Sequence, residues 1–170
     1  MNFSRQKVIR IVIIAAVSLL LLLFGQWMYN TYSIERALIS DLTQKDYIAE
    51  ANLKKHDKFI ELWVKLRNVE NLKEVYSDLN QTTASHLKGK NYIIKFINEP
   101  DKLLEDVYND KIQYLVYEAI QIGNFTNMKI ELDKVKKQTG VDASIYIDKE
   151  NIYIDLKHQD YFIYEVIGRQ

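Results

Sequence analysis

Hydrophobic residues form one long run near the start of the chain, interrupted only by Ser18. Residues 11–24 read IVIIAAVSLLLLLF, and residues 25–29 extend the run to about the ~20 residues that span a bilayer's hydrocarbon. Inside lipid every backbone polar group must be paired within the segment, so the run predicts a membrane-spanning helix over residues 11–29. Aromatic rings with one polar end favour the interface where such a helix leaves the bilayer, and three stand at this point: Trp27, Tyr29 and Tyr32.

A cleaved signal peptide has a similar basic start and apolar middle, but it ends in a small-x-small site. Residues 24–33 read FGQWMYNTYS, with bulky side chains where that site would lie, which favours a retained anchor. Basic residues precede the run, whereas the first two after it have acidic neighbours. Because basic loops stay in the cytoplasm, we expect a cytoplasmic tail over residues 1–10 and the remainder outside the cell membrane.

Residues 30–80 contain neither proline nor glycine, the residues that most reliably interrupt a helix. They therefore predict a charged helical stalk, whose apolar positions recur at steps of three and four between Phe59 and Leu79. Such a stripe must be covered, either as ordinary core packed on a C-terminal sheet or as a seam for self-association. Both readings stay open, and the candidate interaction stripe comprises Phe59, Leu62, Trp63 and Leu66.

Small and polar residues at positions 81–90 predict the end of the stalk and the start of an extracytoplasmic α+β domain over residues 88–170. Residues 91–97 (NYIIKFI) predict a strand, and Pro100 is suited to the first turn of a helix. The periodicity of residues 111–122 fits both a helix and a strand, and that choice stays open. A short helix is expected next, capped near Thr126 and ended by Gly140.

Alternation of apolar and polar residues is clearest over residues 142–169, and it predicts a three-stranded antiparallel meander. A first loop at residues 148–151 gives the expected apolar pairs Ile147 with Ile152, Ile145 with Ile154 and Ala143 with Leu156. A second loop at residues 158–160 is expected to place Phe162, Tyr164 and Val166 beside Leu156, Ile154 and Ile152. Helices packed on this meander would complete the domain.

The other face of the predicted meander mixes rigid aromatic rings with charged side chains. Tyrosine is enriched at protein interfaces, but such rings also stiffen cross-strand pairs or lie beneath a covering helix. All three readings stay open. The candidate interaction face comprises Tyr146, Tyr153, Tyr161 and Ile163.

Composition narrows the chemistry further. The chain has no cysteine, which excludes disulfides, cysteine-ligated metal sites and thiol catalysis. Its formal net charge is zero over 170 residues, and without a basic cluster we expect no nucleic-acid partner. The histidines are dispersed, and the sequence has no phosphate-cradling glycine loop and no HExxH or GxSxG pattern. We therefore expect no catalytic residue, no metal and no cofactor.

These patterns predict a single-pass membrane protein with an extracytoplasmic domain, typical of the bacterial cell envelope because an exported domain lacks disulfides. The expected partners are the lipid bilayer and another membrane or exported protein, or a second copy of this chain. A scaffold, accessory subunit or regulator is the leading interpretation. The alternative is a sensory or small-ligand-binding domain, and an envelope enzyme ranks third.

Overall fold

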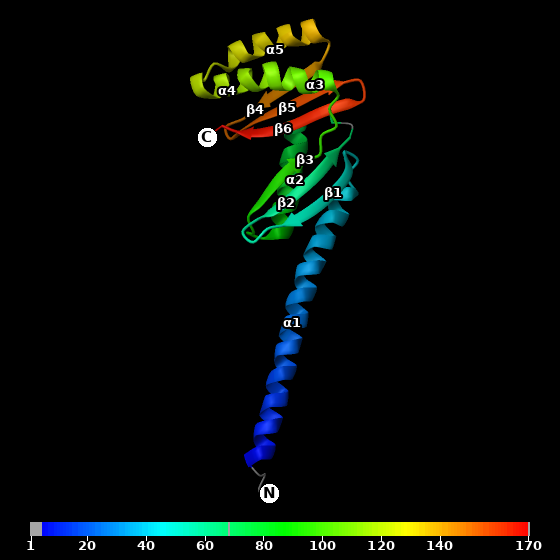
Figure 1. Cartoon of the computed structure of the whole chain (residues 1–170), viewed down its shortest axis with the longest axis vertical. Helices are drawn as coiled ribbons and strands as arrows, with labels where there is room; N and C mark the ends of the chain where they lie inside the picture. The colour runs from blue at the N-terminus through cyan, green and yellow to red at the C-terminus, as the bar shows by residue number, and fades with distance from the viewer. Residues whose placement is uncertain (1–4, 68, 170) are drawn as a thin grey trace.

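The structure is a computed structural model that describes residues 5–67 and 69–169, apart from the side chains of residues 5, 6 and 27–33. The fold is mixed α+β, as expected, with two three-stranded sheets stacked along the long axis (Figure 1). In chain order the elements are α1 (Arg5–Thr43), β1 (Ile48–Lys55), β2 (Ile60–Leu66), α2 (Leu72–Leu87), β3 (Tyr92–Phe96), α3 (Lys102–Val107), the π-helical turn η1 (Tyr108–Ile112), α4 (Gln113–Ile122), α5 (Phe125–Thr139), β4 (Asp142–Ile147), β5 (Asn151–His158) and β6 (Tyr161–Gly168).

Helix α1 projects from the folded part of the molecule as a long rod (Figure 1). Its segment Lys7–Gln26 is long and apolar enough to cross a membrane and is not buried against protein, and no second such segment exists among the described residues. The far end of the same helix enters the protein core, where Leu38 and Leu42 are fully buried. The apolar segment and the folded part therefore share one continuous helix.

The predicted helical stalk over residues 30–80 is wrong for residues 48–66, whereas its beginning and end are helical, in α1 and α2. Residues 48–66 form the antiparallel hairpin of β1 and β2, closed where His56 N–H donates to the carbonyl of Phe59 at 2.9 Å. Without proline or glycine a helix is permitted but not required, and packing in the sheet decides the outcome. Strand β2 is the central strand, and its buried apolar positions repeat every second residue at Ile60, Leu62, Val64 and Leu66.

Helix α2 also extends beyond the expected end of the stalk. Its N-cap is Asn71, whose side chain accepts from the amides of Lys73 and Glu74. The small and polar residues that predicted the end of the stalk lie largely inside the helix, where buried Thr83 donates its hydroxyl to the carbonyl of Leu79 at 2.7 Å. This internal bond satisfies the hydroxyl, so the helix continues to Leu87.

The first folded unit combines the end of α1 with the sheet β1-β2-β3 and α2. Strands β2 and β3 are parallel, with Leu62 opposite Ile94, and α2 is the connection between them. The last turns of α1 and one face of α2 supply apolar side chains to the core of this unit. The buried residues that α2 contributes are Leu72, Val75, Leu79, Thr83 and Leu87.

The second unit places α3, η1, α4 and α5 on one face of the sheet β4-β5-β6 (Figure 1). Residues 111–122, left open by the sequence pattern, are helical: one π turn, in which Gln113 N–H donates to the carbonyl of Tyr108, leads into α4. The expected short helix is α5, and Gly140 ends it at φ 74°, a left-handed conformation that glycine adopts without strain.

The first hairpin of the meander has the predicted register, with Ile147 opposite Ile152 and Ile145 opposite Ile154. The second hairpin is displaced by one residue from the prediction, because Ile163, rather than Phe162, lies opposite Leu156. The turn is shorter than expected, and Gln159 adopts a left-handed φ of 54° within it. A one-residue displacement moves every side chain to the opposite face, so Phe162, Tyr164 and Val166 lie on the face away from the helices.

Candidate functional site

The face of the meander that carries Tyr153 and Tyr164 packs against the first folded unit. Both tyrosines are 3% exposed and belong to the core of that unit. Their rings meet Tyr76 of α2 and Phe96 of β3 in edge-to-face geometry, with centroids 5.7 Å and 6.3 Å apart. The two units are therefore joined by a buried aromatic junction.

The predicted interaction face is not brought together as one surface. Tyr153 lies in the junction, and Tyr146 lies at its margin, where its hydroxyl donates to the carbonyl of Glu70 at 3.3 Å. Ile163 is buried beneath the helices of the second unit, because of the changed register. Tyr161 is 44% exposed, so within this set it alone offers a largely open ring.

The predicted interaction stripe is divided in a similar way. Leu62 and Leu66 are core residues of the first unit, and Phe59 stacks on His56 with centroids 4.6 Å apart. Trp63 points to a groove between the two units. The backbone of the expected membrane-interface residues Trp27, Tyr29 and Tyr32 lies in α1, but their side chains are outside the described part of the chain.

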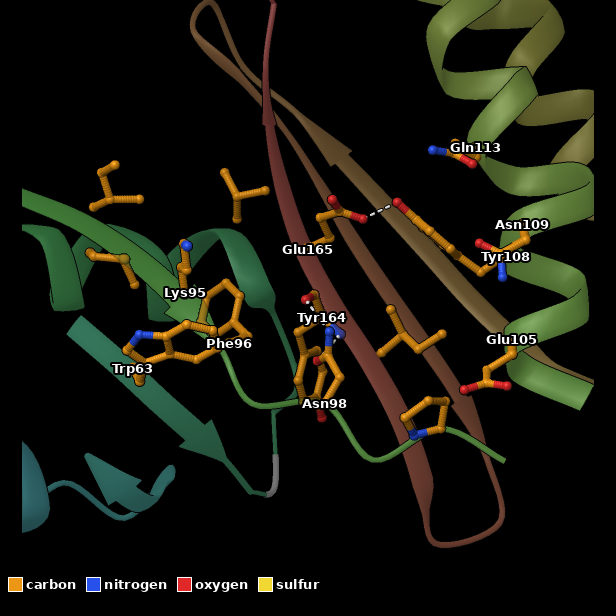
Figure 2. Close-up of a pocket in the computed structure, with 15 residues that line it drawn as sticks. Trp63, Lys95, Phe96, Asn98, Glu105, Tyr108, Asn109, Gln113, Tyr164 and Glu165 are labelled. Atoms are coloured by element: carbon orange, nitrogen blue, oxygen red, sulfur yellow. Dashed lines mark hydrogen bonds between the residues drawn. The ribbon is translucent and has the colours of Figure 1, made fainter. Parts of the chain in front are cut away.

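This groove, with a volume of about 710 Å³, is bounded by β3 on one side and by β6, α3 and η1 on the other (Figure 2). We call it the inter-unit groove. Its lining combines apolar, amide and charged side chains: Trp63, Ile93, Ile94, Lys95, Phe96, Asn98, Pro100, Glu105, Tyr108, Asn109, Gln113, Ile163, Tyr164, Glu165 and Val166.

One end of the inter-unit groove is closed by backbone contacts between the units. Glu99 and Phe162 form an antiparallel bridge, with N···O distances of 3.2 Å and 3.1 Å. Next to it, the side-chain amide of Asn98 accepts from Tyr164 N–H at 2.9 Å and donates to Tyr164 C=O at 3.1 Å. The two units are thus joined at Asn98 and Glu99. From Asn98 back along β3, the strand diverges from β6 (Figure 2).

The β3 side of the groove is held by an ion pair and an aromatic ring. Lys95 Nζ lies 2.7 Å from Glu61 and 5.1 Å from the centre of the Trp63 ring, while Trp63 Nε1 donates to Glu61 at 2.9 Å. The Lys95 hydrogen bond, with that of Trp63, lowers the pKa of Glu61 to about 2. Glu61 is therefore ionised at neutral pH, and Lys95 is drawn back over the sheet.

The opposite side is built around the π turn. Tyr108 donates its hydroxyl hydrogen bond to Glu165 of β6 (Figure 2). Burial, with this bond to Glu165, raises the pKa of the Tyr108 hydroxyl well above its ordinary value of 10.0, so it remains a donor. The extra residue of a π turn re-aims neighbouring side chains, and such turns are frequent at functional sites. Here the turn carries Tyr108 and Asn109, with Gln113 directly after it, all lining the groove.

This arrangement suits binding. Aromatic and aliphatic side chains offer apolar contact, whereas amides and carboxylates offer oriented hydrogen bonds to a ligand. No group of three or more histidine, aspartate or glutamate residues able to hold a metal occurs within residues 5–67 and 69–169. Comparison of the chain with known protein families, with curated proteins and with solved structures finds no match to any of them.

Sequence reasoning missed most of the residues that line the groove. Of the predicted site residues, Trp63 and Ile163 are among them, and neither was predicted for the position it holds. Pro100, which was expected in the first turn of a helix but lies just before the N-cap Asp101 of α3, and the strand at residues 91–97 were recognised as structure only. A residue whose role is to join two units, such as Asn98, has no local signal, because its partner Tyr164 is 66 positions away.

Proposed function

We propose that this chain is a single-pass membrane protein of the cell envelope that displays its two folded units outside the membrane and binds another protein there. The inter-unit groove is the site that we assign to this binding. The observation that carries the proposal is the groove itself, where two sheet edges diverge and amide, carboxylate and aromatic side chains converge. A scaffold, accessory subunit or regulator acts in this way.

The anchor supports this proposal through its continuity with the folded units. The basic residues before the apolar segment favour a cytoplasmic N-terminus. Because α1 passes from that segment directly into the core at Leu38 and Leu42, it would hold the groove at a fixed distance from the bilayer. A fixed height suits a protein that meets partners anchored in, or assembled on, the same membrane.

A small-molecule sensor is the second candidate. A volume of about 710 Å³ falls within the range of ~300–1,000 Å³ typical of ligand pockets. The mixture of apolar walls with a few oriented polar groups also fits a small ligand. Denaturation of the purified full chain would release any retained compound, which mass spectrometry would then identify. Loss of that compound from the variant Gln113→Trp, which narrows the groove, would favour this candidate.

Site-specific photo-crosslinking in native membranes tests protein binding. A benzoyl-phenylalanine placed at Gln113 lines the groove, whereas the same group at the exposed Lys129 on α5 serves as the control. We expect a discrete protein adduct from position 113 and none from position 129. An absence of any adduct from position 113, or the same adduct from both positions, would contradict protein binding in the groove.

A further inference from the structure

We propose that the inter-unit groove takes an extended segment of another exported polypeptide, which adds as a strand along the free edge of β3 and directs a Lys or Arg toward Glu105 and Glu165. This inference rests on the proposed function and specifies its partner. The chemistry that recognises the segment is its peptide backbone, with side-chain charge as the second requirement.

The free edge of β3 supplies the backbone groups. Strand β3 ends its sheet, and its inner side is fixed by two bonds: Asn91 C=O accepts from Ile60 N–H at 2.9 Å, and Ile97 N–H donates to Val64 C=O at 2.8 Å. Backbone groups of successive strand residues point to opposite sides, so those of Ile94 and Phe96 point away from β2. Both residues line the groove, and their outward backbone groups have no hydrogen-bond partner among the described residues, so an extended backbone there would meet open donors and acceptors.

The chain does not complete this pairing itself. Next to the Glu99–Phe162 bridge, the Asn98 side chain bonds both backbone groups of Tyr164. A ladder between β3 and β6 would need these groups of Tyr164 to continue past the bridge. This side-chain substitute ends the ladder and lets the strands diverge. On β6 the groups of Tyr164 are therefore taken and the next outward-pointing residue is Val166, whereas on β3 the outward-pointing residues Ile94 and Phe96 are both open, which favours β3 as the strand that is extended.

Lysine on an edge strand commonly blocks such additions. Here Lys95 is withdrawn, because its ammonium is 2.7 Å from Glu61 and lies over the ring of Trp63. Its charge is thereby compensated within the first unit. The edge is left without the protruding cation that would oppose an added strand.

Charge complementarity defines the side chain that the segment carries. Glu105 and Glu165 line the side of the groove opposite β3, accompanied by the amides of Asn109 and Gln113. Among the described lining residues Lys95 is the single cation, and Glu61 already pairs with it. A basic side chain on the incoming strand compensates the two carboxylates, and a segment that alternates apolar and basic residues satisfies both kinds of lining.

Hydrogen exchange of the full chain in detergent micelles tests the added strand. The probe is a capped nine-residue peptide of alternating Val and Lys. We expect it to slow exchange of the Ile94 and Phe96 amides at least about tenfold, while amides of the outer strand β1 remain unchanged. The same peptide with alternate backbone N-methylation should slow neither amide, and an alternating Val and Glu peptide should bind at least about tenfold more weakly.

Two variants separate backbone pairing from side-chain packing. Ile94→Pro removes the amide that points to the groove and is tolerated on an edge strand, whereas Ile94→Val keeps that amide. We expect the peptide to protect Phe96 in I94V and not in I94P. Equal protection in both, peptide binding without slower exchange at Ile94 and Phe96, or no binding at about 1 mM peptide would overturn the inference.

Slow exchange of Ile94 and Phe96 before peptide is added would also overturn the inference, because it would mean that the edge is covered within the chain. A groove crosslink from position 113 without edge protection contradicts the added strand and leaves the proposed function standing. The absence of that crosslink contradicts the proposed function itself. The two failures are therefore distinguishable.

Discussion

The side chain of Asn98 bonds both backbone groups of Tyr164, accepting from its N–H at 2.9 Å and donating to its C=O at 3.1 Å. A side-chain amide carries a carbonyl acceptor and an N–H donor side by side, so it can imitate both backbone groups of a neighbouring strand. It joins the two folded units at the closed end of the inter-unit groove. The groove therefore owes its shape to a contact between residues 66 positions apart.

Replacement of Asn98 should weaken the junction between the units. Asn98→Ala removes both hydrogen bonds and leaves the Tyr164 groups to water, which should lower the free energy of unfolding by about 1–3 kcal/mol. Asn98→Asp keeps an acceptor for Tyr164 N–H but loses the donor to Tyr164 C=O, so we expect a loss of similar size. Chemical denaturation of the full chain in micelles measures both. An unchanged midpoint in N98A would show that the bonds do not stabilise the junction.

The continuity of α1 leads to a second prediction. Leu38 is fully buried in the core of the first unit although it belongs to the helix that carries the apolar segment. Leu38→Ala should therefore lower the free energy of unfolding by about 2–5 kcal/mol, the usual cost of an apolar cavity. Ala37→Ser, on the exposed side of the same turn, is the matched control and should change the free energy of unfolding little. Equal midpoints for L38A and A37S would contradict this role of α1.

The sequence pattern predicted elements whose partners are local. The first meander hairpin follows from matched apolar pairs and from Asp148, whose side chain accepts from the amides of Glu150 and Asn151 in the turn. The predicted register of the second hairpin differs from the observed one by one residue. Gln159 adopts a left-handed backbone conformation in the turn, and glutamine is not a residue typical of that conformation. Because of this one-residue difference, Ile163 was predicted on the interaction face but lies in the core of the second unit.

The stalk and the groove show where local patterns are insufficient. Residues 48–66 have a composition compatible with a helix, and only their position between α1, α2 and β3 makes them a hairpin. The groove forms where β3 approaches β6, and nothing near Tyr92 or Tyr161 in the sequence specifies that approach. Tertiary packing therefore decided the features that form the candidate site.

The buried carboxyl of Asp155 leads to a prediction about pH. It is 3% exposed at the junction; Oδ2 lies 3.0 Å from Lys157 Nζ, and Oδ1 has no hydrogen-bond partner among the described residues. Burial raises the pKa of Asp155 above its ordinary value of 3.8, against the opposing effect of Lys157. The folded state therefore binds this proton more tightly than the unfolded state does. The resulting stabilisation is complete below about pH 3.8 and is lost as the pH rises through the raised pKa.

Asp155→Asn removes this titration. We expect its free energy of unfolding to decline less than that of the wild type as the pH rises from the ordinary aspartate pKa toward neutrality. Lys157 retains its bond to the carbonyl of Val69 at 2.6 Å, so the variant keeps a partner for the ammonium group. Denaturation midpoints at a series of pH values measure the difference. Parallel curves for D155N and wild type would mean that Asp155 does not titrate differently in the two states.

Orientation in the membrane is testable because the chain has no cysteine, so a single introduced thiol reports its own position. Lys134→Cys places a thiol on the exposed side of α5 in the second unit, and Gln6→Cys places one before the apolar segment. Basic residues near the N-terminus favour retention in the cytoplasm. In intact cells a membrane-impermeant maleimide should therefore label K134C and not Q6C, and permeabilisation should expose both. Labelling of Q6C in intact cells would show that the orientation is the opposite of the one proposed. Recovery of the chain in the medium, shortened near Gln26, would show that the apolar segment is a cleaved signal and not an anchor.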